Sequence, residues 1–368
     1  MKVVISASKG NSLIGFRGKL ITEWIKHDCE VICTSIEDKD EMESAIKDLG
    51  ASYRQIKGNR TGTGFLEGIK MIRDYKIMFR EEQPDIAFLY MSKPIAFGGI
   101  GAILSHVKHI YVFVTGLEIA FYSKGVKNAI VRFVLKTLFR FVHKRADKVF
   151  FMNQDDYNAF LKMGLVKKEQ ARFVNGSGID LNHYSPKPMP EIDSVGMVGR
   201  LVWSKGVGEF IEAAKIVHES HPDVEFFIVG GYDKNPESLT EKEIDCINKQ
   251  GDIKLYGYQN DVRPFVEKCS IFVLPSYHEG NGRSIVEAEA MGRPIVTTQA
   301  PGCRETVEDG VNGFLVPVKD GKRLAEAINK LLDNPDLKKK MAKESVRVSK
   351  KFDVNEVNRI FLTEMNLL

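Results

Sequence analysis

The chain has 368 residues, of which 43% are hydrophobic and 28% charged, a composition typical of a soluble globular protein long enough for two domains. It has no apolar run of 18 residues, so no transmembrane helix is predicted, and its first residues do not resemble a secretory signal. The 5 cysteines are scattered and odd in number, which argues against a disulfide framework and favours the reducing cytoplasm.

The charge is unevenly distributed along the chain. Residues 1–175 carry 28 Lys and Arg against 19 Asp and Glu, a net charge of +9, whereas residues 176–368 carry 25 against 30, a net charge of −5. This asymmetry suggests that the N-terminal half faces an anionic partner.

Short apolar strands alternate with helical patterns in the N-terminal half, which predicts βαβ units and a parallel sheet. The strands are expected at Val3–Ser6, Glu30–Thr34, Ile86–Tyr90, Ile110–Val114 and Val149–Met152. The helices are expected at Lys19–His27, Met42–Leu49, Gly64–Glu82 and Val126–Arg145. A glycine- and proline-rich segment from Asn175 to Pro190 then predicts a linker.

The same alternation restarts after the linker. Strands are expected at Ser194–Val198, Val224–Val229, Ile253–Tyr256, Ile271–Leu274 and Pro294–Thr298. Helices are expected at Val207–Glu219, Val262–Cys269, Arg283–Met291, Arg323–Leu332 and Asp336–Lys350. The prediction is an α/β protein with two Rossmann-like domains facing a cleft, in which ligands bind at the carboxyl ends of the strands.

The predicted domain boundaries follow from these patterns. Residues 1–175 form the first domain, 176–192 the linker and 193–350 the second domain, while 351–368 form a final helix expected to pack back toward the first domain. The chain contains neither GxxxxGK[ST] nor, after its first strand, GxGxxG. These absences argue against a P-loop ATPase and against an NAD-dependent oxidoreductase.

The loop in Val198-Gly-Arg-Leu-Val-Trp-Ser-Lys-Gly206 lies where the first strand of the second domain leads into a helix. Arg200 and Lys205 would project near the helix N-terminus, where backbone N–H groups favour anions. A guanidinium and an ammonium suit a diphosphate, although two solvated cations on a loop are the alternative.

A second loop, in Tyr277-His-Glu-Gly-Asn-Gly-Arg-Ser-Ile-Val-Glu287, joins another strand to a helix. Its glycines allow a ligand to approach the backbone closely, and carboxylates accept paired hydrogen bonds from vicinal hydroxyls such as those of sugars. Glu279 and Glu287 are therefore candidate sugar or ribose ligands. The alternative is that Glu287 and Glu289 are solvated helix residues.

The C-terminal half, over most of residues 194–350, resembles the donor domain of retaining GT-B glycosyltransferases of the large nucleotide-sugar-dependent family four (group 1). The resemblance is carried by VGRLVWSKG (198–206), VEFFIVGG (224–231), IKLYGYQNDV (253–262), IFVLPSYHEGNGRSIVEAEAMGRPIVTT (271–298) and PGCRETVEDGVNGFLVP (301–317). More loosely, LYMSKPIAFGGIGA (89–102) and VFVTGLEIAF (112–121) resemble acceptor domains of bacterial enzymes that extend undecaprenyl-diphosphate-linked or capsular and O-antigen glycans.

This resemblance implies roles for individual residues. Arg200 and Lys205 would bind the donor diphosphate, and Glu279 would contact hydroxyls of the transferred sugar. Glu287 would accept the ribose hydroxyls, and Gly116 would lie opposite the sugar. Further donor contacts are implied at Gly199, Gly257, Tyr258, Asn260, Gly280, Asn281, Gly282, Arg283 and Ser284.

The resemblance also implies a mechanism by front-face attack, in which the diphosphate takes the acceptor proton and Glu279 binds rather than attacks. No metal and no cofactor are expected, because Arg200 and Lys205 balance the leaving charge and the nucleotide-diphosphate sugar is a co-substrate. The sequence departs from the family at two places. Asn281-Gly282 replaces a Phe-Pro or similar pair, and Glu118 is the candidate substitute for a histidine near the reacting carbon.

A basic, phenylalanine-rich helix is predicted in residues 122–148, which carry eight Lys and Arg and one acid. Arg132, Lys136, Arg140 and Lys144 recur every fourth residue, a pattern typical of binding to an anionic membrane surface. A half-buried helix with a basic solvent face is the alternative. Nucleic acid is not predicted, because no recognition motif accompanies the charge. The candidates for the acceptor phosphates are Arg60, Lys93 and Lys124.

Together these patterns predict a retaining hexosyltransferase at the inner face of the plasma membrane, with a UDP-sugar donor and a lipid-linked saccharide acceptor in surface-polysaccharide biosynthesis. Use of GDP-mannose or of a soluble acceptor remains an alternative with the same fold. The alternative outside enzymes is a nucleotide-sugar-binding protein without transfer activity.

Overall fold

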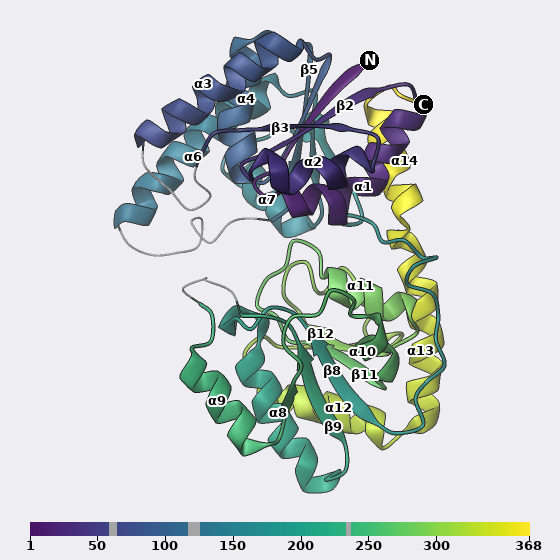
Figure 1. Cartoon of the computed structure of the whole chain (residues 1–368). Coiled ribbons are helices and arrows are strands. Elements are labelled where there is room, and N and C mark those ends of the chain that lie inside the picture. Colours follow the sequence, from purple (N-terminus) through teal and green to yellow (C-terminus); the bar gives the residue numbers. More distant parts are fainter. Residues whose placement is uncertain (59–64, 117–125, 233–236) are drawn as a thin grey trace. The chain divides into compact units, whose positions relative to one another are not determined.

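The computed structural model describes residues 1–58, 65–116, 126–232 and 237–368, and it divides into two compact units (Figure 1). Unit 1 comprises Met1–Gly178 together with Asn355–Leu368, and unit 2 comprises Ile179–Val354. Each unit has its own buried core around a parallel sheet. The predicted α/β class with two Rossmann-like domains is confirmed, whereas the predicted cleft between them stays a prediction.

The described part of unit 1 contains a seven-stranded parallel sheet with the order β3-β2-β1-β4-β5-β6-β7. The order reverses between β1 and β4, so these central strands form the topological switch point. Their apolar residues are buried on both faces, as is usual for a parallel sheet covered by helices. The strands are β1 (Lys2–Ser6), β2 (Glu30–Ser35), β3 (Ser52–Gln55), β4 (Ile86–Tyr90), β5 (His109–Val114), β6 (Lys148–Phe151) and β7 (Ala171–Phe173).

Helices cover both faces of this sheet. One face packs against α3 (Phe65–Glu82), the π-helical segment η1 (Pro94–Gly98), α4 (Gly99–Leu104), α6 (Val126–Arg145) and α7 (Gln154–Lys162). The other face packs against α1 (Gly10–Lys26), α2 (Lys39–Lys47) and the C-terminal α14 (Val354–Glu364). Unit 1 is therefore completed by the last residues of the chain.

Glycines in α4 allow the first of these helix layers to pack closely. A Cβ on Gly99 would lie 2.5 Å from Val142 of α6, and a Cβ on Gly101 would lie 2.6 Å from Tyr75 of α3. Both α3 and α6 therefore pack against α4 on the same face of the sheet, and their outer sides belong to one helix layer.

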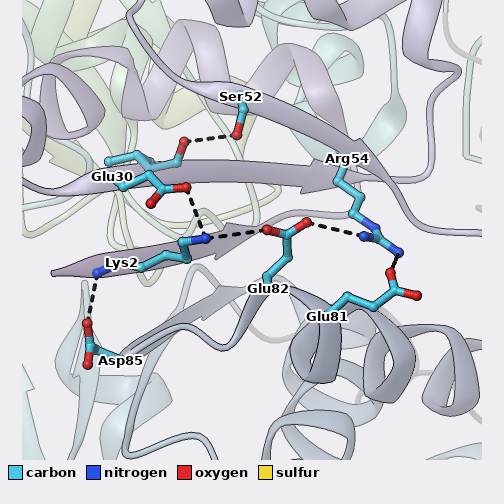
Figure 2. Close-up of polar contacts among 8 residues, drawn as sticks. Lys2, Glu30, Ser52, Arg54, Glu81, Glu82 and Asp85 are labelled. Atoms are coloured by element: carbon cyan, nitrogen blue, oxygen red, sulfur yellow. Dashed lines mark hydrogen bonds and ion pairs between the residues drawn. The ribbon is translucent and has the colours of Figure 1, made fainter.

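A network of ion pairs joins the neighbouring strands β1, β2 and β3 to the end of α3 (Figure 2). Lys2 Nζ lies 3.0 Å from Glu30 Oε1 and 3.6 Å from Glu82 Oε2. The Arg54 guanidinium lies 3.2 Å from Glu82 Oε1 and 2.5 Å from Glu81 Oε2. The network thus connects β1, β2, β3 and α3 through side chains that start from regular secondary structure.

The described part of unit 2 contains a six-stranded parallel sheet with the order β10-β9-β8-β11-β12-β13, and its switch point lies between β8 and β11. The strands are β8 (Ser194–Val198), β9 (Glu225–Val229), β10 (Lys254–Leu255), β11 (Ile271–Leu274), β12 (Ile295–Thr298) and β13 (Gly313–Val316). The helices are α8 (Val207–Ser220), α9 (Glu241–Gln250), α10 (Arg263–Lys268), α11 (Arg283–Ala290), α12 (Gly321–Leu332) and α13 (Pro335–Ser349).

Most of the segment predicted as a linker belongs to unit 2, because Arg293 anchors it. The buried Arg293 guanidinium donates from Nη2 to Pro188 O at 2.8 Å and to Lys187 O at 3.3 Å. Earlier in the same segment, Ile179 N–H donates to Phe352 O at 2.9 Å. The start of unit 2 is thus paired with its end.

The structure also contains elements that the sequence analysis missed. One predicted helix, Lys19–His27, already begins at Gly10. The missed strands are β3, β7 and β13, and the missed helical segments are η1, α4, α7 and α9. Most of them are short or polar, so they lack the long apolar pattern on which the predictions relied.

Candidate functional site

Two loops meet at the switch point of unit 2, where ligands bind in open parallel sheets. The first, residues 199–206, follows β8, and the second, residues 275–282, follows β11. Gly206 has φ = +78°, and a Cβ there would lie 2.1 Å from Pro275 O, so only glycine allows the loops to approach this closely. The two sequence-predicted loops are therefore neighbours in space.

The central feature of the site is an ion pair between Lys205 Nζ and Glu279 Oε1. The two side chains are 19% and 13% exposed, so the pair is largely shielded from water but still reachable. A diphosphate approaching Lys205 would compete with Glu279 for the ammonium group, which would leave the carboxylate available to sugar hydroxyls.

The loop after β12 fixes the backbone of Glu279. Glu279 N–H donates to Pro301 O at 2.8 Å, and Gly302, at φ = +77°, would bring a Cβ within 2.1 Å of Glu279 O. The fully buried Cys303 lies beneath these residues, and burial, reinforced by the Glu279 charge, raises the pKa of its thiol to about 12. Cys303 is thus a neutral packing residue here. It lies within the motif of residues 301–317, but no role was predicted for it.

The second carboxylate, Glu287, is also held by a cation. Arg283 Nε donates to Glu287 Oε1 at 2.7 Å, one turn apart on α11. Burial, followed by the charge of Glu287, raises the pKa of the nearby Tyr184 phenol. Arg283 was predicted only as a donor contact, and its pairing with Glu287 was not expected. Tyr184 was missed, because it lies far away in the chain and carries no motif.

The alternative that Glu287 and Glu289 are solvated helix residues is wrong. Glu287 is 7% exposed and Glu289 is fully buried, where Asn312 Nδ2 donates to Glu289 Oε1 at 2.8 Å. Burial raises the pKa of Glu289 well above its usual value. The two glutamates face different surroundings, and Glu287 alone belongs to the site.

Glycine turns that follow β8, β9 and β10 lie against one another at the same edge of the sheet. A Cβ on Gly230 would lie 1.7 Å from Gly199 O, and Gly230 N–H donates to Gly257 O at 2.9 Å. Tyr258 packs against Gly231 while remaining 74% exposed, so its ring is accessible to a ligand. The predicted donor residues from three loops are thus brought to one edge of the sheet.

The exposed Arg200 and Asn260 and the half-buried Gly280, Asn281 and Ser284 lie in or next to these loops at the same edge of the sheet. The backbone N–H groups expected to meet the sugar or phosphate are partly engaged within the protein. Gly282 N–H donates to Gly302 O at 2.7 Å, and Arg283 N–H donates to Asn281 O at 2.6 Å. Their proposed ligand contacts stay predictions.

Several candidates belong to unit 1. Gly116 follows β5 with φ = +129°, and Lys93 immediately precedes η1. Arg60, Glu118 and Lys124 lie outside the described residues. The roles predicted for these five stay predictions.

The basic helix predicted from the sequence is α6, and its outer side is both apolar and basic. Ile130, Phe133 and Phe141 are 61%, 72% and 54% exposed, whereas the phenylalanine between them, Phe139, is buried. Lys144 is exposed, Arg132 and Lys136 are half-buried, and Arg140 is exposed while it donates from Nη2 to Met163 O at 2.9 Å. The solvent face of α6 therefore carries large apolar side chains as well as basic ones, and its binding to a membrane stays a prediction.

Two features are absent from the described residues. No helix within residues 1–58, 65–116, 126–232 and 237–368 is long and apolar enough to cross a membrane. The same part of the chain contains no group of three or more His, Cys, Asp or Glu residues placed to hold a metal ion.

Comparison with protein families identifies the domain that carries this site. Residues 189–347 match the family of glycosyl transferases group 1. Unit 2 is a group 1 glycosyltransferase domain. The match includes both loops of the switch point, so the charged pairs of this domain lie in its matched region.

Curated relatives extend the similarity beyond the group 1 domain. The chain is 27% identical to N,N'-diacetylbacillosaminyl-diphospho-undecaprenol alpha-1,3-N-acetylgalactosaminyltransferase of Campylobacter jejuni, over 98% of this chain and 97% of the relative. It is also 27% identical to UDP-Gal:alpha-D-GlcNAc-diphosphoundecaprenol alpha-1,3-galactosyltransferase of Escherichia coli, over 72% of this chain and 70% of that protein. These homologues act on saccharides linked to a lipid diphosphate.

Solved structures share the two-unit GT-B fold. Anabaena Alr3699/HepE in complex with UDP has a TM-score of 0.80 at 19% identity, with all of both chains covered. Sucrose-phosphate synthase from Thermosynechococcus elongatus has a TM-score of 0.81 at 17% identity and covers 100% of this chain and 98% of its own. At these identities the similarity establishes the fold.

Proposed function

We propose that this chain is a retaining glycosyltransferase that moves a hexose or N-acetylhexosamine from a UDP-sugar to a lipid-diphosphate-linked saccharide. Its product would enter a surface polysaccharide such as a capsule or lipopolysaccharide. The Lys205–Glu279 pair carries this proposal, because it places a cation and a carboxylate together at the switch point of the group 1 domain.

The reaction requires the protein to stabilise the charge of the leaving diphosphate and to position the donor sugar. As the bond from the anomeric carbon to the diphosphate breaks, Lys205 and Arg200 stabilise the negative charge on the departing phosphate. Glu279 binds hydroxyls of the transferred sugar, and Glu287 binds those of the ribose. The acceptor hydroxyl attacks from the side of the leaving group and gives its proton to the diphosphate, so the configuration is retained. Lys205 and Arg200 make a metal unnecessary, so activity should survive excess EDTA.

A UDP-sugar is the donor that the comparisons favour. The name of the Escherichia coli relative specifies UDP-Gal, and solved structural neighbours hold UDP and UDP-glucose. The exposed ring of Tyr258 beside the glycine turns offers a surface on which a base can stack.

Binding measurements test the donor first. The melting temperature of the protein is measured with UDP, GDP and ADP, and a ligand at a hundred times its Kd stabilises by about 2.7 kcal/mol. UDP should give the largest shift, and transfer from UDP-galactose and UDP-N-acetylgalactosamine to a lipid-diphosphate saccharide should follow, with NMR showing retention. A larger shift with GDP, or inversion at the anomeric carbon, would contradict the proposal.

The acceptor proposal is supported by the outer sides of α6 and α3. On α3, Leu66 and Ile69 are 73% and 48% exposed and are followed by the exposed Lys70 and Arg73. Because α3 and α6 belong to one helix layer, they present apolar and basic groups on the same side of unit 1. Such a surface suits the anionic cytoplasmic face of the plasma membrane, where a lipid-linked acceptor resides.

Flotation with phosphatidylglycerol-containing liposomes tests this membrane surface. The double variant Phe133→Ser/Phe141→Ser should lose most of its binding at low salt, because each phenylalanine offers apolar area to the lipid. Phe16→Ser is the matched control, since Phe16 is 45% exposed on α1, which covers the opposite face of the sheet. Equal flotation of both variants and the wild type would contradict the proposed location.

A further inference from the structure

Tyr277 joins the loop of Glu279 to the helix that follows Lys205. Its hydroxyl donates to the Glu209 carboxylate, with Oε1 at 2.7 Å and Oε2 at 2.9 Å. Both side chains are half-buried, and Glu209 lies in the first turn of α8. The contact therefore links the loop of residues 275–282 to the helix that directly follows the loop of residues 199–206.

Backbone hydrogen bonds connect the same loops at a second point. Ser204 O accepts from Tyr277 N–H at 2.9 Å and from Ser276 Oγ at 3.1 Å. Lys205 follows Ser204 directly, and Glu279 follows Tyr277 by two residues. The Lys205–Glu279 pair is thus held by a closed ring of contacts, in which Tyr277 and Glu209 pair through their side chains.

We infer that Tyr277 and Glu209 are positioning residues that hold the carboxylate of Glu279 at its working distance from Lys205. The phenol contributes a hydrogen bond in its neutral form, and Lys319 Nζ packs 5.0 Å from the centroid of its ring. The inference rests on the proposed function, because Lys205 and Glu279 are the groups whose geometry it concerns. Neither Tyr277 nor Glu209 has been assigned a donor or acceptor contact.

Removal of the hydrogen bond should lower turnover more than donor affinity. In Tyr277→Phe the loop of Glu279 loses its link to α8, and small displacements of reacting groups are costly in the transition state. We expect kcat to fall about tenfold, with the KM for the UDP-sugar and the Kd for UDP within about threefold of wild type, as for an interaction felt mainly in the transition state.

Variants at Glu209 separate positioning from substrate contact. Glu209→Ala should reproduce the effect of Tyr277→Phe, whereas Glu209→Gln keeps an oxygen that accepts from the phenol and should restore most of kcat. The double variant Tyr277→Phe/Glu209→Ala should be no worse than either single variant, because all three lack the same bond. If Tyr277 touched the substrate directly, Glu209→Ala would instead resemble wild type.

A matched control exists in the same unit. Tyr256 OH donates to Glu225 Oε1 at 3.2 Å, a contact of the same chemical type that does not connect the two loops of the site. Tyr256→Phe should leave kcat unchanged. Release of UDP from UDP-galactose and from UDP-N-acetylgalactosamine, with and without a lipid-diphosphate saccharide, serves as the activity measurement.

Hydrogen exchange of residues 275–282 gives a reading independent of activity. These amides should exchange faster in Tyr277→Phe and Glu209→Ala than in wild type, and at the wild-type rate in Glu209→Gln and Tyr256→Phe. Wild-type kcat in Tyr277→Phe, additive losses in the double variant, or unchanged exchange would overturn the inference. A wild-type protein that releases no UDP would instead refute the proposed function, while the exchange rates still decide whether the ring of contacts exists.

Discussion

Ion pairs occur in both units, but they differ in the secondary structure that carries them. In unit 1, Lys2 and Arg54 lie on strands and pair with Glu81 and Glu82 at the end of a helix (Figure 2). In unit 2, Lys205 lies in the short helical turn before Gly206 and pairs with Glu279 on a loop. The side chains of Arg54 and Glu81 are 32% and 57% exposed, against 19% and 13% for the pair in unit 2.

This difference separates stabilising from functional ion pairs. The charged side chains on the strands of unit 1 connect secondary-structure elements, and water screens their interactions. Charges on loops at a topological switch point are better shielded, and glycines there allow a ligand to reach them. The first kind should affect the free energy of unfolding, and the second kind should affect catalysis.

The largest expected effect comes from the functional pair. Lys205→Ala should lower turnover by at least ~100-fold, the scale observed when one stabilising group of a transition state is removed. Steady-state release of UDP measures it, and Lys215→Ala, an exposed lysine on the following helix, is the control. If Lys205→Ala kept the turnover of the wild type, the Lys205–Glu279 pair would not be a functional ion pair.

Buried titratable groups should make the two units respond oppositely to pH. In unit 1, burial lowers the pKa of His143 from 6.5 to about 4. Between these pH values the imidazole is therefore protonated in the unfolded state and neutral in the folded state. Stability should therefore fall as pH falls from 6.5 toward 4, by about 2 kcal/mol between pH 7.5 and 5. In unit 2, Glu289 has a raised pKa, so its stabilisation is fully present below 4.5 and is lost as pH rises through the raised value.

The two tryptophans allow this to be measured, because Trp24 lies in unit 1 and Trp203 in unit 2. Denaturant unfolding followed by fluorescence in Trp203→Phe and in Trp24→Phe backgrounds reports one unit at a time. His143→Asn should flatten the pH profile of unit 1, and Glu289→Gln that of unit 2. Profiles that these substitutions leave unchanged would show that other groups set the pH dependence.

The smallest expected effect comes from the ion-pair network of unit 1. Arg54→Ala removes two ion pairs and should lower the free energy of unfolding by about 1 kcal/mol at low salt and by less at high salt. Its turnover should equal that of wild type. The exposed pair of Arg359 and Glu356 on α14 provides the control, and Arg359→Ala should cost still less. Loss of turnover in Arg54→Ala would contradict the division into stabilising ion pairs in unit 1 and functional ion pairs in unit 2.

The sequence predicted the elements whose apolar runs are long, such as β1, β4 and β11. It missed α9, although Thr240 and Glu243 form a capping box that is recognisable in the sequence. It missed α4 because glycine disfavours helices, and in the fold Gly99 and Gly101 are needed for close packing against α6 and α3.

Within the site, the residue types were predictable but their pairing was not. Lys205 and Glu279 lie after different strands, β8 and β11, and only the order β8-β11 in the sheet makes them neighbours. The hydrogen bond between Tyr277 and Glu209 has no local signature either, since it depends on how two loops pack. The burial of Glu289, two residues after Glu287, follows from the direction that each side chain takes from α11.

The position of α14 in unit 1 has a consequence for biosynthesis. Phe361 packs on Phe88 and Phe150 with ring centroids 5.4 Å and 4.8 Å apart, so the core of the first unit includes residues that the ribosome adds only after all of unit 2. Unit 2 is continuous in the chain and can fold as soon as its residues have emerged. The nascent protein is therefore expected to carry an open, incomplete N-terminal unit until residues 355–368 have emerged, and chaperones are expected to bind that unit in the meantime.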